Sequence, residues 1–418
     1  MARTSVAVQR ADVGGQASVG ADPMRAILIK GRSAYGALRL FIDELAGAFA
    51  RAGVEPVVID GIVETDLAAA LRRAATGGAE LVFSFNILGD FTDRGQSVTD
   101  IAGAPHVIHY VDYPLTHWQA LDATSAQAAL LCVDRTHPVA IRSIWGADRF
   151  AHLGFCAHAA VGETVSPGAD PGAFARARPI PILFTGTFYR RATPHWSDMP
   201  ERAQQIFEAA YEVASAGVGL PALAALDAVL KQLGLEPADP RYAALRKGAA
   251  FVHEHLRFQR RLQLIQAADR LGVQLHVCGS GYENALDEFS NLVHHGEPSF
   301  HEALGLMAQA RVVLNVNANF SAGSHERVFS AMNAGAAVVS DSSTFYAAAF
   351  RPGREIGLYS WDALDAGLAG LQALSQDAEA AHAMACAGQR RVLAEHRWDH
   401  RIGDILDAAR QARARRAA

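Results

Sequence analysis

Cysteine is scarce in this sequence, which has only four among 418 residues. The four are Cys132, Cys156, Cys278 and Cys386, and no two of them form a Cys-x-x-Cys pair. Zinc ribbons and disulfide-stapled folds both need cysteines at close, repeated spacings. We therefore exclude both classes and expect reduced thiols that are mostly buried.

Long apolar runs and concentrations of positive charge are also missing. No stretch approaches the roughly 18 apolar residues of a membrane span. The net charge is −5 and the basic residues are scattered, unlike the basic footprint of a nucleic-acid-binding protein. Residues 1–23 are small and polar without an apolar centre, and we expect them to be disordered. These absences favour a cytoplasmic globular protein with no nucleic-acid partner and no membrane span.

Metal-ligand and dinucleotide motifs are missing as well, although the chain has 17 histidines. The pairs His253/His255 and His294/His295 have no further ligands nearby, whereas a metal site needs ligands that converge at known spacings. The loop after the first expected strand lacks the full G-x-G-x-x-G spacing of a dinucleotide site. The sequence therefore predicts neither a metal nor a dinucleotide cofactor.

What the sequence does contain is an alternation of short apolar strands and amphipathic helices. The first expected strand, residues 26–30, ends in a glycine loop, and a helix follows at about residues 38–52. Further strands are expected at residues 57–60, 81–86, 107–111, 129–134 and 152–156. Repeating βα units of this kind predict a parallel sheet of about six strands in a Rossmann-like domain over residues 24–165.

A second unit follows a shift in composition. Residues 166–181 are rich in proline, glycine and alanine and are interpreted as a linker. A second Rossmann-like domain is expected over residues 182–395, with an all-helical insertion at about residues 200–264 that is too long for one crossover. Residues 396–418 are expected to form a helix that can pack back on the first domain through the stripe Trp398, Ile402 and Ile405.

The most informative stretch, residues 311–341, reads as a strand, a loop, a helix and a strand. An apolar run gives way to small polar residues at 318–324, and helical spacing begins at His325, with Val328, Phe329 and Met332 facing inward. Ligands bind beyond the carboxyl ends of parallel strands, and a helix start favours an anion. A cation in the first turn opposes the helix dipole. We therefore interpret Arg327 as facing a bound anion, most simply a phosphate.

Several motifs, taken in order, resemble those of a known family. They are HYVDYP at 109–114, HLGFCAH at 152–158, ILFTGTFYRR at 182–191, HVCGSGYEN at 276–284, HGEPSFHEALGLMAQARVVLNVN at 295–317 and SHERVFSAMNAGAAVVSD at 324–341. Their order and spacing are similar to those of the GT-B glycosyltransferases, and in particular of the CgeB-like group. The resemblance implies two Rossmann-like domains that face each other across a cleft. It also implies transfer of a sugar from a nucleotide diphosphate sugar to a glycan, protein or metabolite acceptor, without a metal or another cofactor.

The resemblance assigns the donor to loops of the second domain and the acceptor to the first. Phe300 or Tyr282 is expected to stack on the nucleotide base. Arg190 and Arg191 are expected to face the diphosphate. The glycines at the strand ends either let the backbone approach the diphosphate closely or are needed only for tight turns. The predicted donor set is Gly186, Thr187, Arg190, Gly279, Ser280, Gly281, Tyr282, His295, Gly296, Phe300, Asn317, Ser324, His325, Glu326 and Arg327. The predicted acceptor set is Gly31, Tyr35, Gly36 and Asp90.

One departure from the family pattern concerns the ribose. In the retaining enzymes of this fold a glutamate stands where this chain has Ser330, and its partner glutamate would fall at Ala322. Glu326 lies four residues before Ser330 and therefore on the same helical face. Two interpretations stay open: Glu326 replaces the ribose carboxylate, or it only complements the helix dipole.

The missing glutamates favour an inverting transfer, which needs a base for the acceptor proton. We predict that Asp112 is this base, with His117, Asp90 and His109 as reserves in that order. The predicted catalytic set is Asp112, His117 and Arg327. The alternative for Asp112 is that it caps a turn before Pro114. Two other functions also stay open, a nucleotide-sugar epimerase of the same fold and a catalytically inactive nucleotide- or glycan-binding protein.

Overall fold

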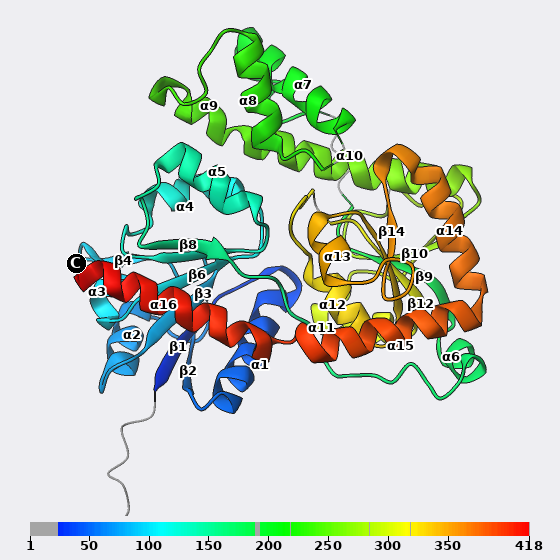
Figure 1. Ribbon diagram of the computed structural model, residues 1–418, viewed down its shortest axis with the longest axis horizontal. Coiled ribbons are helices and arrows are strands. Elements are labelled where there is room, and N and C mark those ends of the chain that lie inside the picture. The colour runs from blue at the N-terminus through cyan, green and yellow to red at the C-terminus, as the bar shows by residue number, and fades with distance from the viewer. Residues whose placement is uncertain (1–23, 189–192, 218, 284, 318, 418) are drawn as a thin grey trace, which may run out of the picture.

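The N-terminal domain is built on a sheet of six parallel strands with helices on both faces (Figure 1). The computed structural model describes residues 24–188, 193–217, 219–283, 285–317 and 319–417. The strand order in this sheet is β2-β1-β3-β6-β7-β8. All five residues of β3 are buried, which is why this strand reads as an uninterrupted apolar run. The strands of this domain are β1 (Arg25–Lys30), β2 (Glu55–Asp60), β3 (Leu81–Phe85), β6 (His106–Tyr110), β7 (Ala129–Cys132) and β8 (His152–Phe155).

Helices and one short hairpin connect these strands. The hairpin pairs β4 (Thr92–Asp93) with β5 (Gln96–Ser97), and the sequence patterns did not predict it. The helices are α1 (Ala37–Arg51), α2 (Leu67–Ala75), α3 (Val98–Ala102), α4 (Trp118–Ala123) and α5 (Thr136–Trp145), with the 3-10 turns η1 (Ala34–Gly36) and η2 (Pro114–His117). Each connection between successive strands of this sheet contains a helix, which supplies the dozen or more residues that a crossover between parallel strands needs.

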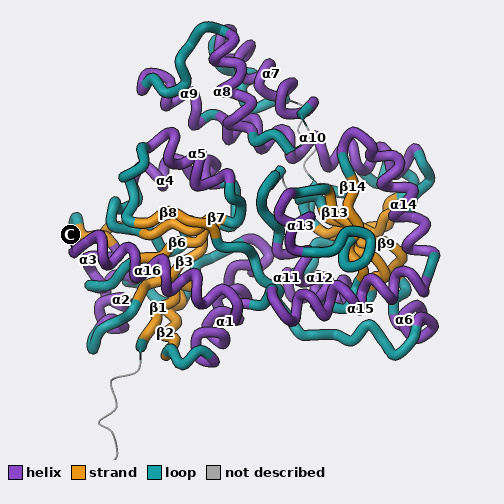
Figure 2. Tube along the Cα trace, viewed as in Figure 1, coloured by secondary structure: helices purple, strands orange, loops and turns teal. Residues whose placement is uncertain are grey.

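The second domain repeats this architecture in the strand order β11-β10-β9-β12-β13-β14. All its pairings are parallel, and the order reverses between β9 and β12. The strands are β9 (Ile180–Thr185), β10 (Leu275–Cys278), β11 (Leu292–His294), β12 (Ala310–Asn315), β13 (Ala337–Asp341) and β14 (Gly357–Tyr359). The helices that cover it are α6 (Pro171–Ala177), α11 (Phe300–Ala308), α12 (Glu326–Asn333), α13 (Thr344–Ala349), α14 (Leu364–Gln376) and α15 (Ala378–Glu395). Figure 2 shows the two sheets, each enclosed by helices.

The predicted fold, two Rossmann-like domains with a helical insertion in the second, is confirmed. The insertion separates β9 from β10 and consists of α7 (Glu201–Ala216), α8 (Ala222–Gln232), η3 (Pro240–Tyr242), α9 (Ala243–Lys247) and α10 (Ala249–Arg270). Its first helices form a lobe beside α4 and α5 of the N-terminal domain (Figure 1). Arg246 donates to the Ser143 carbonyl and Lys247 to Asp122, so the lobe is also bonded to that domain.

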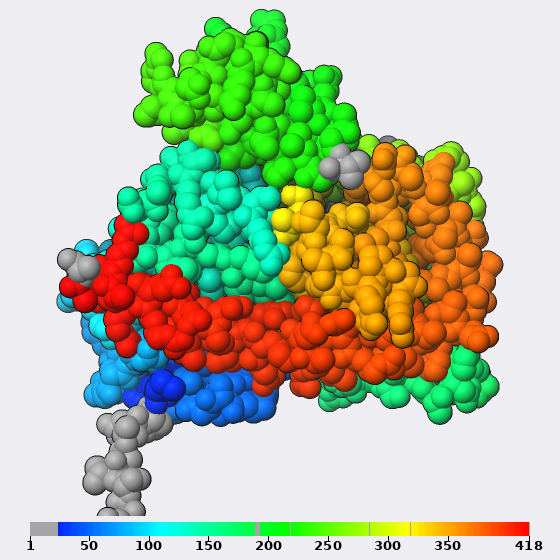
Figure 3. Space-filling view, in the orientation of Figure 1, coloured from blue at the N-terminus to red at the C-terminus, as the bar shows by residue number. Residues whose placement is uncertain are grey.

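The chain crosses between the domains twice, and the two crossings are bonded to each other. Ala160 donates its amide proton to the His396 carbonyl, and residues 160 and 397 form a parallel bridge. Beyond the second crossing, η5 (Trp398–Arg401) and α16 (Ile402–Ala417) lie on the N-terminal domain. The indole of Trp398 is 2% exposed and packs against Phe41 and Phe85. Figure 3 shows α15 and α16 as one band across both domains.

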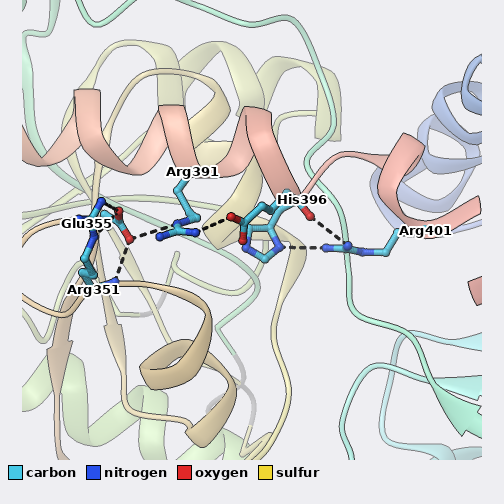
Figure 4. Close-up of polar contacts among 6 residues, drawn as sticks. Arg351, Glu355, Arg391, His396 and Arg401 are labelled. Atoms are coloured by element: carbon cyan, nitrogen blue, oxygen red, sulfur yellow. Dashed lines mark hydrogen bonds and ion pairs between the residues drawn. The ribbon is translucent and has the colours of Figure 1, made fainter. Parts of the chain in front are cut away.

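Buried polar contacts hold the second crossing (Figure 4). Glu355 is 2% exposed and accepts hydrogen bonds from Arg351 and Arg391. Arg401 contacts His396 Nδ1 at 3.0 Å and donates to the His158 carbonyl at 2.9 Å, so it links the two crossings.

The structure corrects one boundary, because residues 166–181, interpreted as a linker, contain α6 and the start of β9.

All four cysteines are free thiols, and three of them are buried. Among the described helices, none has both the length and the apolar character needed to cross a membrane.

Candidate functional site

A cavity of about 300 Å³ lies between the two domains, beyond the carboxyl ends of strands from both sheets. In the second sheet it lies where the strand order reverses between β9 and β12, which is where open α/β sheets bind ligands. Its lining residues are Tyr35, Ala37, Asp112, Thr185, Gly186, Thr187, Arg257, Arg261, Cys278, Gly279, Pro298, Phe300, Ala303, Met307, His325, Glu326 and Arg327. Nine of the residues predicted from the sequence therefore meet in one cavity.

Two glycines let the ends of β9 and β10 approach each other at the floor of this cavity. Gly186 has φ 137° and Gly279 has φ 124°, values that side chains other than glycine rarely adopt. A Cβ on Gly279 would lie 2.8 Å from the carbonyl carbon and oxygen of Gly186. Because any side chain would collide there, the floor is open backbone that a ligand can approach closely.

Arg327 lies in the first turn of α12 and reaches across the ends of β9 and β12. Its Nε donates to Thr185 Oγ1 at 2.6 Å and its Nη1 donates to Asn315 Oδ1 at 2.7 Å. The residue is 6% exposed, and no carboxylate among the described residues lies within ion-pair distance of it. Neutral partners hold the guanidinium in place without cancelling its charge, so the arrangement leaves a fixed positive charge for an anion.

Two further arginines, which the sequence analysis did not assign to the site, come from α10 of the insertion. Arg257 and Arg261 are four residues apart, so both project from one face of the helix into the cavity. Arg261 donates to the Thr187 carbonyl and therefore braces the loop after β9. The signal that would have found them is this spacing of two cations on one helical face.

Glu326 and His325 form a pair beside Arg327. His325 Nδ1 lies 2.6 Å from Glu326 Oε2, and the Glu326 side chain is 13% exposed. Burial alone would raise the pKa of Glu326, but His325, His158 and Arg327 together outweigh burial and lower this pKa to about 2. Glu326 is thus an ionised hydrogen-bond acceptor at the cavity wall at neutral pH.

Asp112 faces the cavity from the N-terminal domain, just beyond β6. Asn86 Nδ2 donates to its carboxylate at 2.7 Å, and His117 Nε2 lies 3.8 Å away. The Asp112 side chain is 55% exposed. Desolvation between the domains would raise its pKa, but His117, Arg257 and His325 together lower it below the ordinary value. No backbone N–H of the described residues donates to this carboxylate, so the geometry does not support the turn-capping alternative.

Other predicted residues lie away from the cavity, which corrects the sequence interpretation. Asp90 is hydrogen-bonded by Thr124 inside the N-terminal domain. His109 is fully buried and contacts the Cys156 carbonyl, so it cannot serve as a reserve base. Tyr282 is also fully buried and stacks on Phe188, so its ring is not available to a nucleotide base.

The remaining predicted residues support the site or lie near it without lining the cavity. Asn317 Nδ2 donates to the carbonyls of Phe320 and Gly323, which shapes the loop before α12. Ser330 Oγ accepts the Val161 amide proton, so the position of the missing glutamate contacts an interdomain crossing. Not among the lining residues are Gly31, Gly36, His117, Ser280, Gly281, His295, Gly296, Asn317 and Ser324. Arg190 and Arg191 fall outside the residues that the structure describes.

Metal ligands do not gather in this region. Among the described residues, no three histidine, cysteine, aspartate or glutamate side chains are placed to hold one ion.

Several solved structures match most of this chain at low sequence identity. Anabaena HepE in complex with UDP and glucose is 11% identical, with a TM-score of 0.46, over 94% of this chain and 99% of that chain. Sucrose-phosphate synthase from Thermosynechococcus elongatus is 14% identical, with a TM-score of 0.49, over 94% of this chain and 99% of that one. An alpha-glucosyltransferase in complex with UDP and a 13-mer DNA is 10% identical, with a TM-score of 0.46, over 93% of this chain and 100% of that chain. These likenesses are too distant to bear on substrate.

A comparison of sequences gives a more direct result for the second domain. No curated protein matches the chain. Residues 257–407 match a family model described as glycosyl transferase-like, and the matched segment begins at Arg257 and includes Arg261, Glu326 and Arg327. The part of the chain that supplies the cationic wall of the cavity is therefore similar in sequence to glycosyltransferases.

Proposed function

We propose that this protein is a metal-independent glycosyltransferase of the CgeB-like group, whose cavity binds a nucleotide diphosphate sugar. The observation that carries this proposal is the convergence of Arg257, Arg261 and Arg327 on the glycine floor beyond β9 and β10. A diphosphate is the anion that best suits several fixed cations above exposed backbone. The match of residues 257–407 to the glycosyltransferase-like family supports the same proposal.

The cavity lining combines apolar and positively charged side chains, as a nucleotide combines a base with phosphates. Phe300, Pro298 and Met307 provide apolar surface for a base, and the three arginines provide positive charge. The volume of about 300 Å³ is at the lower limit of the roughly 300–1,000 Å³ typical of ligand pockets. We assign the diphosphate to the arginines and the base to the apolar residues around Phe300.

The reaction requires a base on one side of the sugar and a stabilised leaving group on the other. The acceptor hydroxyl oxygen bonds to the anomeric carbon while the bond from that carbon to the diphosphate oxygen breaks. Asp112 takes the acceptor proton, and the nucleoside diphosphate leaves with the electron pair. The three arginines stabilise this charge in place of a metal ion, and hydrogen bonds hold Arg261 and Arg327 in position before the reaction begins. Because Asp112 comes from the N-terminal domain while Arg261 and Arg327 belong to the second, we assign an inverting course.

A thermal-shift screen with UDP, GDP, dTDP, CDP and CMP sugars tests the donor assignment. A ligand that binds only the native protein, at about 100 times its dissociation constant, stabilises it by about 2.7 kcal/mol. We expect one diphosphate donor to raise Tm and the CMP sugars, which lack a diphosphate, to leave it unchanged. A shift with CMP sugars alone would contradict the diphosphate site.

The same ligands separate the two other functions. Formation of an isomerised nucleotide sugar without any acceptor would identify an epimerase of this fold. Absence of affinity for every nucleotide would indicate an inactive binding protein, which the serine at position 330 and the alanine at position 322 would then explain.

Substitution of Glu326 tests whether it recognises the ribose. Its carboxylate is ionised and lines the cavity, so it can accept hydrogen bonds from ribose hydroxyls. Glu326→Gln should discriminate less than the parent between a nucleotide and its 2′,3′-dideoxy form, as measured by calorimetry. Glu379→Gln is the matched control, because Glu379 also lies in a first helical turn but belongs to α15. Unchanged discrimination in Glu326→Gln would leave only the dipole interpretation.

A further inference from the structure

Tyr35 has a backbone conformation that its neighbours must maintain. It lies in η1, in the loop between β1 and α1, with φ 56° and ψ 4°. This left-handed conformation costs free energy in a residue other than glycine and persists only where surrounding contacts hold it. The side chain is 40% exposed, so burial in a core does not supply those contacts.

The contacts that hold Tyr35 come from the other domain. Its hydroxyl lies 2.5 Å from Ser280 Oγ and 3.2 Å from Thr187 Oγ1. The Ser280 amide also donates to this hydroxyl at 3.4 Å. Tyr35 therefore spans the cleft and joins the loop after β9 to the loop after β10.

These partners are hydrogen-bond donors that a diphosphate would use. Thr187 and Ser280 offer their hydroxyls and the Ser280 amide proton beside the glycine floor, where the proposed function places the diphosphate. The phenol oxygen accepts the Ser280 amide proton and lies within hydrogen-bond distance of both hydroxyls, which is the position that a phosphate oxygen would take. The phenol oxygen of Tyr35 and a phosphate oxygen cannot occupy this position at the same time.

We propose, on the basis of the proposed function, that the Tyr35 hydroxyl stands in for a donor phosphate oxygen and is displaced when the diphosphate binds. Displacement frees the β1–α1 loop from the second domain.

Tyr35→Phe tests this proposal, because it keeps the ring and the backbone strain but removes the competing oxygen. Inorganic pyrophosphate is the probe, since it carries the diphosphate without a base or sugar. Because a neutral hydrogen bond no longer has to be broken, pyrophosphate should bind about 2- to 13-fold more tightly, as measured by calorimetry. Tyr242→Phe is the matched control, because it removes a half-buried tyrosine hydroxyl from η3 in the insertion.

A second measurement tests the Tyr35 contact without relying on a change in pyrophosphate affinity. Amide hydrogen exchange at residues 279–281 should be faster in Tyr35→Phe than in the parent when no ligand is present, and pyrophosphate should slow it in both. Equal or weaker pyrophosphate binding by Tyr35→Phe would overturn the role of Tyr35 while leaving the diphosphate site intact. Absence of pyrophosphate and nucleoside diphosphate binding in the parent would overturn both proposals.

Discussion

Asp112→Asn should lower turnover by a factor of roughly 10² to 10⁴, the usual contribution of a general base. The amide keeps the size of the side chain and can still contact Asn86, so the fold should persist. Donor affinity should change little, because Asp112 comes from the N-terminal domain while Arg261 and Arg327 belong to the second. Steady-state turnover, donor calorimetry and Tm, measured on one preparation, test these three expectations together.

Three further tests distinguish a general base at Asp112 from a structural role of this residue. Asp93→Asn is the matched control, since Asp93 is a half-exposed carboxylate of the same domain that pairs with Arg72. The pKa of Asp112 is held below its ordinary value of about 4. A base must be deprotonated, so turnover should be lost only as the pH falls below about 4. Retained anomeric configuration in the product, or near-normal turnover in stable Asp112→Asn, would remove Asp112 from the base role.

The parts of the site that follow directly from a strand could be predicted from the sequence. The apolar run before residue 318 and the helical spacing after His325 located the start of α12, and Arg327 lies there as expected. Gly186 and Gly279 were found for the same reason, because glycine at the end of a buried strand indicates close backbone approach. These inferences are local, and they depend only on where a strand ends.

The residues that the sequence analysis missed or misplaced have side chains whose direction is set by the tertiary structure. Arg257 and Arg261 reach the cavity only because α10, the last helix of the insertion, runs back to the second sheet. Tyr282 follows a strand as Thr187 does, yet its ring turns into the core against Phe188. A position after a strand does not fix where a side chain points. The pairing of Asn86 with Asp112 likewise joins neighbouring strands, β3 and β6, that are far apart in the sequence.

Arg327→Ala should weaken binding of a nucleoside diphosphate far more than binding of the bare nucleoside. Charge-assisted hydrogen bonds of this kind contribute about 1.5 to 3 kcal/mol, which corresponds to about 13- to 150-fold in affinity. The guanidinium also bonds Thr185 and Asn315, so its removal leaves buried polar atoms unpaired and lowers the free energy of unfolding. The ratio of the two affinities separates these effects, because a loss of folded protein reduces both equally.

Arg311→Ala provides the matched control for that ratio. Arg311 is a half-buried arginine of the same sheet that donates to the carbonyls of Arg178 and Ser375 and does not line the cavity. Its removal should lower Tm in the manner of Arg327→Ala while leaving the ratio of diphosphate to nucleoside affinity unchanged. Calorimetry gives the affinity of each variant for both ligands, and urea unfolding gives the free energy of unfolding of each variant. If Arg327→Ala reduced both affinities by the same factor, as Arg311→Ala is expected to do through folding alone, Arg327 would be a structural arginine. The diphosphate would then have to be held by Arg257 and Arg261 of the insertion helix.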